Sequence, residues 1–283
     1  MSLHGFLLAR DSAMMNVRDG RTLILRDAAE ESATLVLNGY VEKWVEGAIF
    51  PSEMAFFLAK CAVEDVSVVV ESGRQDGYST EILGDWASRG ERQVVSIDLE
   101  QDVERAAACR QRLARWPVEL IKGSAYEEFG RWTKRKSPGR VGFLADGPKG
   151  WPAISMMAAA TTEQVKVVAL HNLTVGSSER AFFEEIDGKS AFYESAIVDP
   201  GKRWVELRER ELIVTRASEA ARSLDVSSLG VMALDPQKRA TFRNSWRSEF
   251  GLHQPAAVRA FWGMGALAAS TKLYGLSYRL LGR

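Results

Sequence analysis

The chain has little of several residue types that mark particular classes of protein. It contains only two cysteines in 283 residues, Cys61 and Cys109, and their spacing fits neither a disulfide framework nor a metal-binding motif. Lysine plus arginine equals aspartate plus glutamate at 37 each, so no overall basic field points to nucleic acid. No uninterrupted apolar run reaches the roughly 20 residues that span a bilayer. We therefore expect a cytoplasmic protein whose two cysteines are reduced and buried.

Apolar runs alternate with stretches of helical spacing through the middle of the chain. β-branched and other apolar residues predict buried strands over residues 68–70, 94–97, 118–121, 141–145 and 165–170. This alternation is typical of an α/β fold with a parallel sheet and helices on both faces. Two further runs, 204–207 and 212–214, flank a charged turn and predict an antiparallel pair at the end of the sheet. Residues 196–198 are an alternative sixth strand.

The ends of the chain have a different organisation from the middle. Residues from about 34 to 62 predict one or two helices, with a helix start at Pro51. Helical stretches also follow residue 216. We therefore divide the chain into an N-terminal helical cover over 1–50, an α/β domain over 51–216 and a helical extension over 217–283.

The most informative segment follows the first predicted strand. Glu71 ends the apolar run, Gly73 and Gly77 bracket a loop, and Ser79 stands at the start of the next helix. Glycines allow a tight turn and a close approach of backbone to ligand. The spacing differs from the G-x-G-x-x-G pattern that packs a pyrophosphate against a helix. An acid before a more open loop instead favours a ligand with a cationic amine.

Chemically active side chains stand at the ends of the later strands. Asp98 closes the second strand about 25 residues after Gly73, where an acid in a nucleotide-binding unit accepts hydrogen bonds from ribose hydroxyls. The other interpretation of Asp98 is an acid that begins the following helix. Asp146 follows the fourth strand, and His171 and Asn172 follow the fifth. Because parallel strands end at one edge of a sheet, these side chains should converge on one crevice together with Glu71.

At these positions the chain resembles the class I S-adenosylmethionine-dependent methyltransferases. It is most similar to the metal-dependent small-molecule and sugar O-methyltransferases of the catechol and macrolide-sugar types. Asp146, Lys149 and Asn172 match the pattern of that group, whereas His171 stands where an aspartate is usual. The resemblance covers about residues 50–216. It implies a Rossmann-like seven-stranded sheet, mostly parallel, with an antiparallel last strand.

The resemblance also implies a cofactor, a metal and a reaction. S-adenosylmethionine would be held by Glu71, Gly73, Gly77, Ser79, Asp98, Ser124 and Asp146. Ser124 would lie near the adenine, although a serine that only caps a helix explains it equally well. A Mg²⁺ or Mn²⁺ ion would bind Asp146, His171 and Asn172, whose oxygen and imidazole donors suit a divalent cation. The implied reaction is methyl transfer to a hydroxyl of a small molecule, such as a sugar or a secondary metabolite.

His171 leaves alternatives open. An imidazole shifts metal preference toward Mn²⁺, Fe²⁺ or Zn²⁺, and in a metal-free site His171 or Lys149 would act as the base. A further alternative is a catalytically silent protein that binds S-adenosylmethionine and uses its aromatic tail over residues 256–281 for a partner or a membrane. A nicotinamide dehydrogenase is the remaining Rossmann alternative, and the glycine spacing and the cluster of Asp146, His171 and Asn172 argue against it. We expect this tail to pack on its own domain or on a second copy in a homo-oligomer rather than on a membrane.

Overall fold

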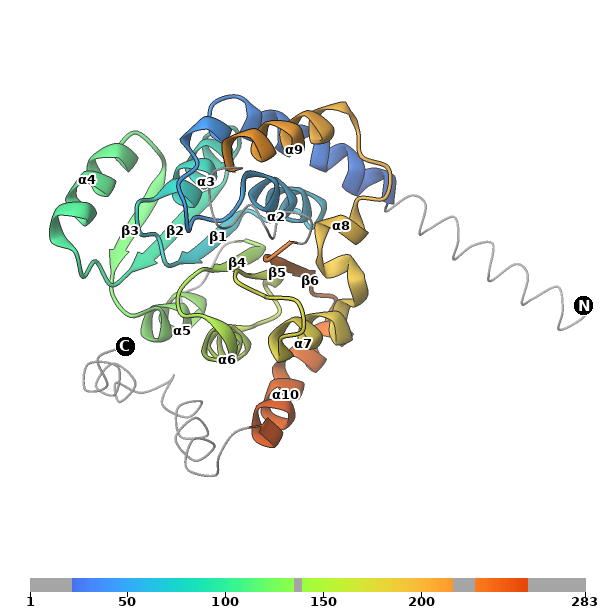
Figure 1. The fold of residues 1–283 in the computed structure, drawn as a ribbon. Coiled ribbons are helices and arrows are strands. Elements are labelled where there is room, and N and C mark those ends of the chain that lie inside the picture. Colours follow the sequence, from blue (N-terminus) through green and yellow to red (C-terminus); the bar gives the residue numbers. More distant parts are fainter. Residues whose placement is uncertain (1–21, 135–138, 216–226, 254–283) are drawn as a thin grey trace, which may run out of the picture.

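The computed structural model describes residues 22–134, 139–215 and 227–253, with the side chains in these ranges except at 133, 134 and 245–253 (Figure 1). The strands are β1 (Val68–Ser72), β2 (Gln93–Asp98), β3 (Val118–Lys122), β4 (Val141–Ala145), β5 (Val165–Leu170) and β6 (Gly230–Ala233). They form one sheet in the order β3-β2-β1-β4-β5-β6. The first five strands pair in parallel, and β6 runs antiparallel to β5.

This topology confirms the predicted fold class, a mostly parallel sheet with an antiparallel last strand and helices around it. Six strands lie within the described residues, one fewer than predicted. Strand β1 stands near the centre of the sheet, and all five of its residues are buried. Burial on both faces explains its uninterrupted valine run, because neither face of the strand meets water.

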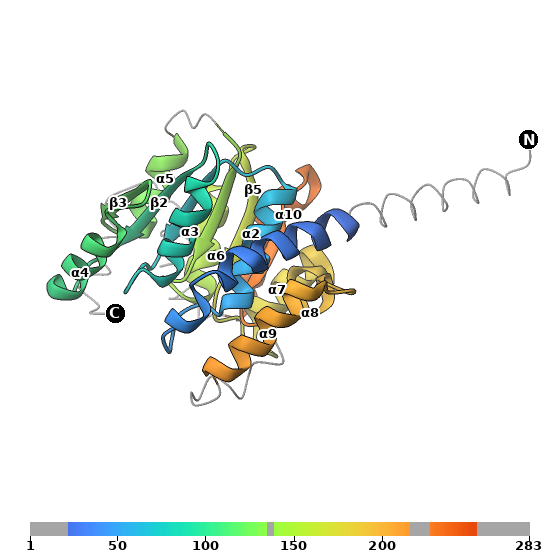
Figure 2. The ribbon, with the colours of Figure 1, turned by 90° about the horizontal axis from the view of Figure 1, so that it is seen from above.

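Helices cover both faces of the sheet (Figures 1 and 2). One face packs against the helix over residues 22–37, α2 (Pro51–Val63), α3 (Tyr78–Ser88) and α9 (Lys202–Thr215). The other face packs against α5 (Ala125–Lys134), α6 (Gly150–Ala160), α7 (Ser178–Asp187) and α10 (Pro236–His253). Helix α4 (Val103–Leu113) lies beyond the β3 side of the sheet. The short helical elements are η1 (Val41–Lys43), η2 (Gly188–Ala191) and α8 (Tyr193–Ala196).

The predicted antiparallel pair at 204–207 and 212–214 is wrong, because both segments lie in α9. Trp204, Leu207 and Glu211 are the buried residues in the body of this helix, and their spacing of three and four positions is helical. The antiparallel strand is β6, which pairs with β5 through register partners such as Val168 and Met232. The sheet therefore continues beyond residue 216, the predicted end of the α/β domain.

Several local predictions hold. Pro51 is the first residue of α2, and Cys61 and Cys109 are buried and free of disulfides. Among the described helices, none combines the length and the apolar character that crossing a membrane requires. The aromatic tail over residues 256–281 lies outside the described residues.

A buried carboxylate on α9 holds this helix against the first turn of α2. Glu211 accepts hydrogen bonds from the backbone nitrogen of Ser52 at 2.6 Å and from its hydroxyl at 3.0 Å, and it pairs with Arg208. Burial raises the pKa of Glu211 to about 7, although Arg208 and Ser52 oppose the shift. Because the folded-state pKa lies above the unfolded value, the stability from this group is greatest below the unfolded pKa. It is lost as the pH rises toward 7.

We expect the substitution Glu211→Gln to flatten this pH dependence. The titration of Glu211 should cost the wild type about 2 kcal/mol of unfolding free energy between pH 5 and pH 8, and the variant should lack this loss. Urea denaturation at the two pH values measures the difference. Glu209→Gln is the matched control, since Glu209 is exposed on the same helix. Equal pH slopes for the wild type and Glu211→Gln would contradict the assignment.

Candidate functional site

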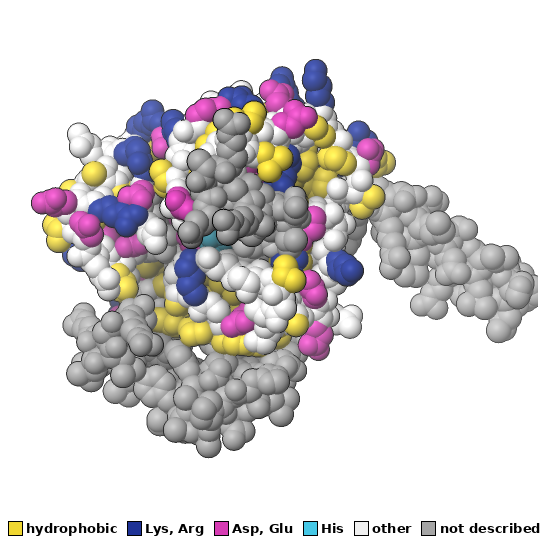
Figure 3. Space-filling view, viewed as in Figure 1, with side chains coloured by type: hydrophobic (Ala, Val, Ile, Leu, Met, Phe, Trp, Pro, Cys, Tyr) yellow, Lys and Arg dark blue, Asp and Glu magenta, His cyan; other side chains and the backbone are white. Residues whose placement is uncertain are grey.

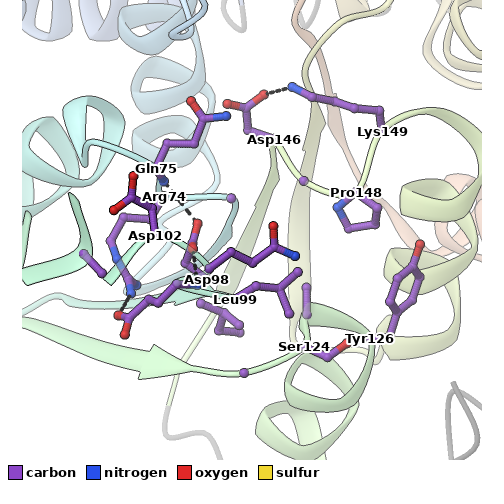
Figure 4. Close-up of a pocket in the computed structure, with 18 of the residues that line it drawn as sticks. Arg74, Gln75, Asp98, Leu99, Asp102, Ser124, Tyr126, Asp146, Pro148 and Lys149 are labelled. Carbon is purple, nitrogen blue, oxygen red and sulfur yellow. Dashed lines mark hydrogen bonds and ion pairs between the residues drawn. The ribbon is translucent and has the colours of Figure 1, made fainter. Parts of the chain in front are cut away.

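A cavity of about 580 Å³ opens at the carboxyl edge of the sheet. Its walls come from the loop after β1, the segment after β2, the start of α5 and the turn after β4 (Figure 4). Ligands in open α/β sheets bind at this edge. The predicted site residues that line the cavity are Gly73, Asp98, Ser124, Asp146 and Lys149. Those outside its lining are Glu71, Gly77, Ser79, His171 and Asn172.

The two glycines of the loop after β1 affect its structure in different ways. Gly73 has φ +86°, and a Cβ at this position would lie 2.5 Å from the backbone nitrogen of Gly147. Only glycine therefore lets the loop after β1 pack directly on the turn after β4, where both border the cavity. Gly77 has φ +79° and precedes α3, and a Cβ there would lie 2.7 Å from Cys109 Sγ. Gly77 thus shapes the loop from outside the cavity.

Glu71 lies beneath the loop rather than in the cavity. Its fully buried carboxylate accepts hydrogen bonds from the hydroxyls of Ser79 at 2.5 Å, Thr80 at 2.5 Å and Ser96 at 2.6 Å. Burial raises the pKa of Glu71, and the three hydroxyls together with Arg74 oppose the shift. Glu71 and Ser79 therefore fasten the first turn of α3 to β1 and β2, and they support the loop without bordering the ligand space.

Asp98 stands on the cavity wall with both carboxylate oxygens already oriented. Oδ2 accepts a hydrogen bond from the backbone nitrogen of Gln75 at 3.1 Å, and Oδ1 accepts one from that of Glu100 at 2.7 Å. Each carboxylate oxygen can accept a second hydrogen bond, which matches a pair of neighbouring hydroxyls. The cap of α4 is Asp102, which accepts from the backbone nitrogen of Arg105 at 3.0 Å. Asp98 therefore does not cap α4.

The sequence patterns did not single out Arg74 and Gln75, which also line the cavity. Gln75 has φ +45°, a conformation that non-glycine residues rarely adopt. Its side chain extends toward the Asp146 end of the cavity (Figure 4). The buried guanidinium of Arg74 donates to the carbonyl of Ser96 at 2.7 Å and pairs with Glu100. Arg74 thereby fixes the segment that follows Asp98, and the only sequence signal for either residue is its place between the two glycines.

The side chains predicted to meet at the ends of β4 and β5 do come together. Oδ1 of Asp146 lies 2.6 Å from Nδ1 of His171 and 3.4 Å from Nδ2 of Asn172. The same oxygen accepts a hydrogen bond from the ammonium of Lys149 (Figure 4). Nδ2 of Asn172 also lies 2.8 Å from Nδ1 of His171, so three nitrogen atoms gather around one carboxylate oxygen. Asp146 and Lys149 border the cavity, whereas His171 and Asn172 lie behind Asp146.

This arrangement does not fit a divalent metal. A metal site needs several lone pairs directed at one point, but the nitrogens of Lys149, His171 and Asn172 all turn toward Asp146. Within the described ranges, no group of three histidine, cysteine, aspartate or glutamate side chains is placed to hold a metal ion. The predicted Mg²⁺ or Mn²⁺ site at Asp146, His171 and Asn172 is therefore not supported. Lys149 contributes to this result, because its ammonium pairs with the one carboxylate among the three predicted ligands.

The position of His171 also bears on its predicted role as a base. Its side chain is 6% exposed, and Nε2 lies 3.7 Å from Oε2 of Glu53, on the far side of the ring from Asp146. Both ring nitrogens thus face carboxylates of the protein rather than the cavity. The side chain of Lys149 is 49% exposed and borders the cavity. Of the two predicted bases, Lys149 is the one that a ligand can reach.

The surface around the site carries no single sign of charge. On the face shown in Figure 3, lysine and arginine side chains are interspersed with aspartate and glutamate over the described part of the chain. The ion pairs agree with this picture, since Arg105 pairs with Asp76 and Arg110 pairs with Glu100 beside the cavity. This face therefore has no extended positive region, in its described part, that would attract a polyanion.

No family model matches the sequence, and no curated protein matches it either. Solved structures similar to the chain include an O-methyltransferase from Bacillus cereus in complex with S-adenosylhomocysteine. It is 14% identical, the match covers 74% of this chain and 91% of that one, and the TM-score is 0.40. Another is the methyltransferase PaMTH1 from Podospora anserina bound to S-adenosylhomocysteine, with 12% identity, coverage of 74% and 88%, and a TM-score of 0.38.

Proposed function

We propose that the chain transfers a methyl group from S-adenosylmethionine to a hydroxyl oxygen of a small molecule. The observation that carries this proposal is the cavity at the carboxyl edge of the sheet, with Asp98 at one end of its polar wall and the Asp146–Lys149 pair at the other (Figure 4). Its volume of about 580 Å³ lies within the range of small-molecule sites, roughly 300–1,000 Å³.

The polar groups of the cavity match the parts of this cofactor. The oriented oxygens of Asp98 suit the two ribose hydroxyls. Ser124 and Tyr126 border the region beyond Asp98 (Figure 4) and would lie against the flat adenine. The glycine loop and Asp146 stand where the amino-acid part with its cationic amine would lie, so that a carboxylate faces a positive charge.

The protein contributes to this reaction mainly by positioning the donor and the acceptor. The sulfonium of the donor supplies the reactivity, and the acceptor oxygen must be held in line with the methyl group. The oxygen forms the new bond to carbon as the bond from sulfur to carbon breaks, and the hydroxyl proton must leave. The ammonium of Lys149 would hold the acceptor oxygen, and the carboxylate of Asp146 would take up its proton. A metal ion has no part in this proposal.

The experiment that tests the function measures S-adenosylhomocysteine formed from S-adenosylmethionine and a panel of hydroxylated sugars, phenols and aliphatic alcohols, in the presence of a chelator. We expect transfer to at least one acceptor class. The substitution Lys149→Met should lower turnover about 100-fold, the size of a lost proton-transfer or orienting group, and leave S-adenosylhomocysteine affinity within threefold.

Lys202→Met on α9 is the matched control, since Lys202 is exposed and lies outside the cavity. Unchanged turnover in Lys149→Met would remove Lys149 from the mechanism. A gain of more than tenfold on adding Mn²⁺ would contradict a metal-free reaction. Binding of the cofactor without transfer to any acceptor would instead favour the catalytically silent binding protein.

A further inference from the structure

A second cavity, of about 610 Å³, lies between η1, the start of α3 and the end of α4. Its lining includes three cations, Lys43, Arg112 and Arg115, and two carboxylates, Asp76 and Glu81. These five residues are not part of the lining of the first cavity. The second cavity is therefore a separate space, which the proposed methyl transfer does not use.

The carboxylate of Glu81 brings the three cations together. The side chain of Glu81 is only 5% exposed, whereas the three cationic side chains are about half exposed. Arg115 pairs directly with Oε1 of Glu81. Nζ of Lys43 lies 3.7 Å from the same oxygen, and Nε of Arg112 lies 3.8 Å from Oε2. Both distances exceed the roughly 3.2 Å limit of a hydrogen bond, so Glu81 leaves the donors of Lys43 and Arg112 available to a ligand.

Aromatic rings hold two of these cations in place. Nζ of Lys43 lies 4.9 Å from the centre of the Tyr40 ring, and the guanidinium carbon of Arg115 lies 4.7 Å from the centre of the Trp116 ring. The face of an aromatic ring attracts a cation at such distances. Side chains that are already held lose less freedom when a ligand binds. Lys43 and Arg115 are therefore preorganised for binding.

The second cavity carries an excess of positive charge. Asp76 is neutralised from outside the cavity by Arg105, whose Nε donates to Oδ1 of Asp76 at 2.5 Å. The hydrogen bond from Arg105 lowers the pKa of Asp76, so this carboxylate stays ionised and paired. Glu81 offsets one of the three cations in the lining. The remaining excess of two positive charges complements a dianion.

Among small anions, a phosphate group suits this excess better than a carboxylate. A phosphomonoester carries about −1.5 to −2 charge at pH 7 and three acceptor oxygens, whereas a carboxylate carries a single charge on two oxygens. Each guanidinium group can donate two parallel hydrogen bonds to such oxygens. We propose that the second cavity binds a phosphate group, either free or carried by a small molecule, through Lys43, Arg112 and Arg115. This proposal does not depend on the methyl transfer.

The test is a calorimetric titration of inorganic phosphate into the full chain at pH 8, in a phosphate-free buffer without cofactor. We expect saturable binding with a Kd below about 1 mM. Arg112→Gln and Lys43→Gln should each weaken this binding about tenfold, the effect of losing one hydrogen bond between charged groups. Both side chains are about half exposed, so neither variant loses core packing. No saturation up to about 10 mM phosphate, or variant affinities within threefold of wild type, would overturn the proposal.

Two control variants show where the phosphate binds. Arg131→Gln removes a similarly exposed arginine that lies outside both cavities. Lys149→Met removes the lysine that borders the first cavity. Both variants should keep the wild-type affinity for phosphate. An equal loss of affinity in Arg131→Gln would show an effect of net charge alone, and a loss confined to Lys149→Met would place the phosphate in the first cavity. Either result would overturn the proposal.

A second titration distinguishes the two sources of the phosphate group. The cavity has room for a small organic molecule, so ribose 5-phosphate is the probe for a phosphomonoester and ribose is its control. If ribose 5-phosphate binds more tightly than inorganic phosphate and Arg112→Gln weakens it, the result supports an ester. The reverse order of affinities supports free phosphate. Binding of ribose equal to that of ribose 5-phosphate would show that the phosphate group is not recognised and would overturn the proposal.

Discussion

Replacing Asp98 with alanine should weaken the binding of S-adenosylhomocysteine by about 100-fold. Hydrogen bonds to a charged group contribute about 1.5–3 kcal/mol each, and the carboxylate is fixed so that both oxygens can accept from ribose hydroxyls. The substitution also removes the carboxylate that accepts hydrogen bonds from the backbone nitrogens of Gln75 and Glu100. Two walls of the cavity are then no longer joined through this side chain. The dissociation constant from calorimetric titration measures the effect.

The control for Asp98 is Asp102→Ala. Asp102 also lines the cavity, but its carboxylate caps α4. We expect Asp102→Ala to lower stability by about 1 kcal/mol, as the loss of a cap does, and to change affinity less than fivefold. An affinity of Asp98→Ala within threefold of wild type would show that the ligand does not use this carboxylate.

The substitution Gly73→Ala should have the largest effect on the fold of the site. A Cβ would lie 2.5 Å from the nitrogen of Gly147 and 2.8 Å from the carbonyl carbon of Asp146, both in the backbone, which cannot rotate away. Crowding of this kind costs about 1–3 kcal/mol, and the positive φ adds about 1–2 kcal/mol. We therefore expect a loss of about 3–4 kcal/mol of unfolding free energy and no detectable binding of S-adenosylhomocysteine.

Gly47→Ala separates the two causes. Gly47 has φ +88°, almost the value of Gly73, but nothing lies within 4 Å of its added Cβ. Urea denaturation of this variant should show only the backbone cost, and binding should be unchanged. If the two variants lose the same free energy, the loop after β1 does not pack on the turn after β4 as described.

The sheet and its ligand edge were predictable from the sequence because buried strands consist of uninterrupted apolar residues. The valines of β1 are apolar without interruption since both faces are covered. The meeting of Asp146, His171 and Asn172 was predictable because parallel strands end at one edge. The α9 segment was misread, because Leu212 and Ile213 form an apolar run that suggests a strand although both side chains are exposed.

What the sequence could not predict is the direction of individual side chains. Glu71 turns to the hydroxyls of α3 and β2 rather than to the cavity, and its position at the end of a strand is the same in either case. Lys149 turns back onto Asp146, and its ammonium pairs with the carboxylate that was predicted to hold a metal ion. Glu53 escaped attention because its partners Ser228 and Leu229 lie far along the chain.

Whether the cavity binds S-adenosylmethionine is measured by a calorimetric titration of S-adenosylhomocysteine into the full chain with a chelator. We expect saturable binding at one site, unchanged when Mn²⁺ replaces the chelator, and much weaker binding of NADH. Absence of S-adenosylhomocysteine binding, or equal binding of NADH, would contradict the proposed cofactor.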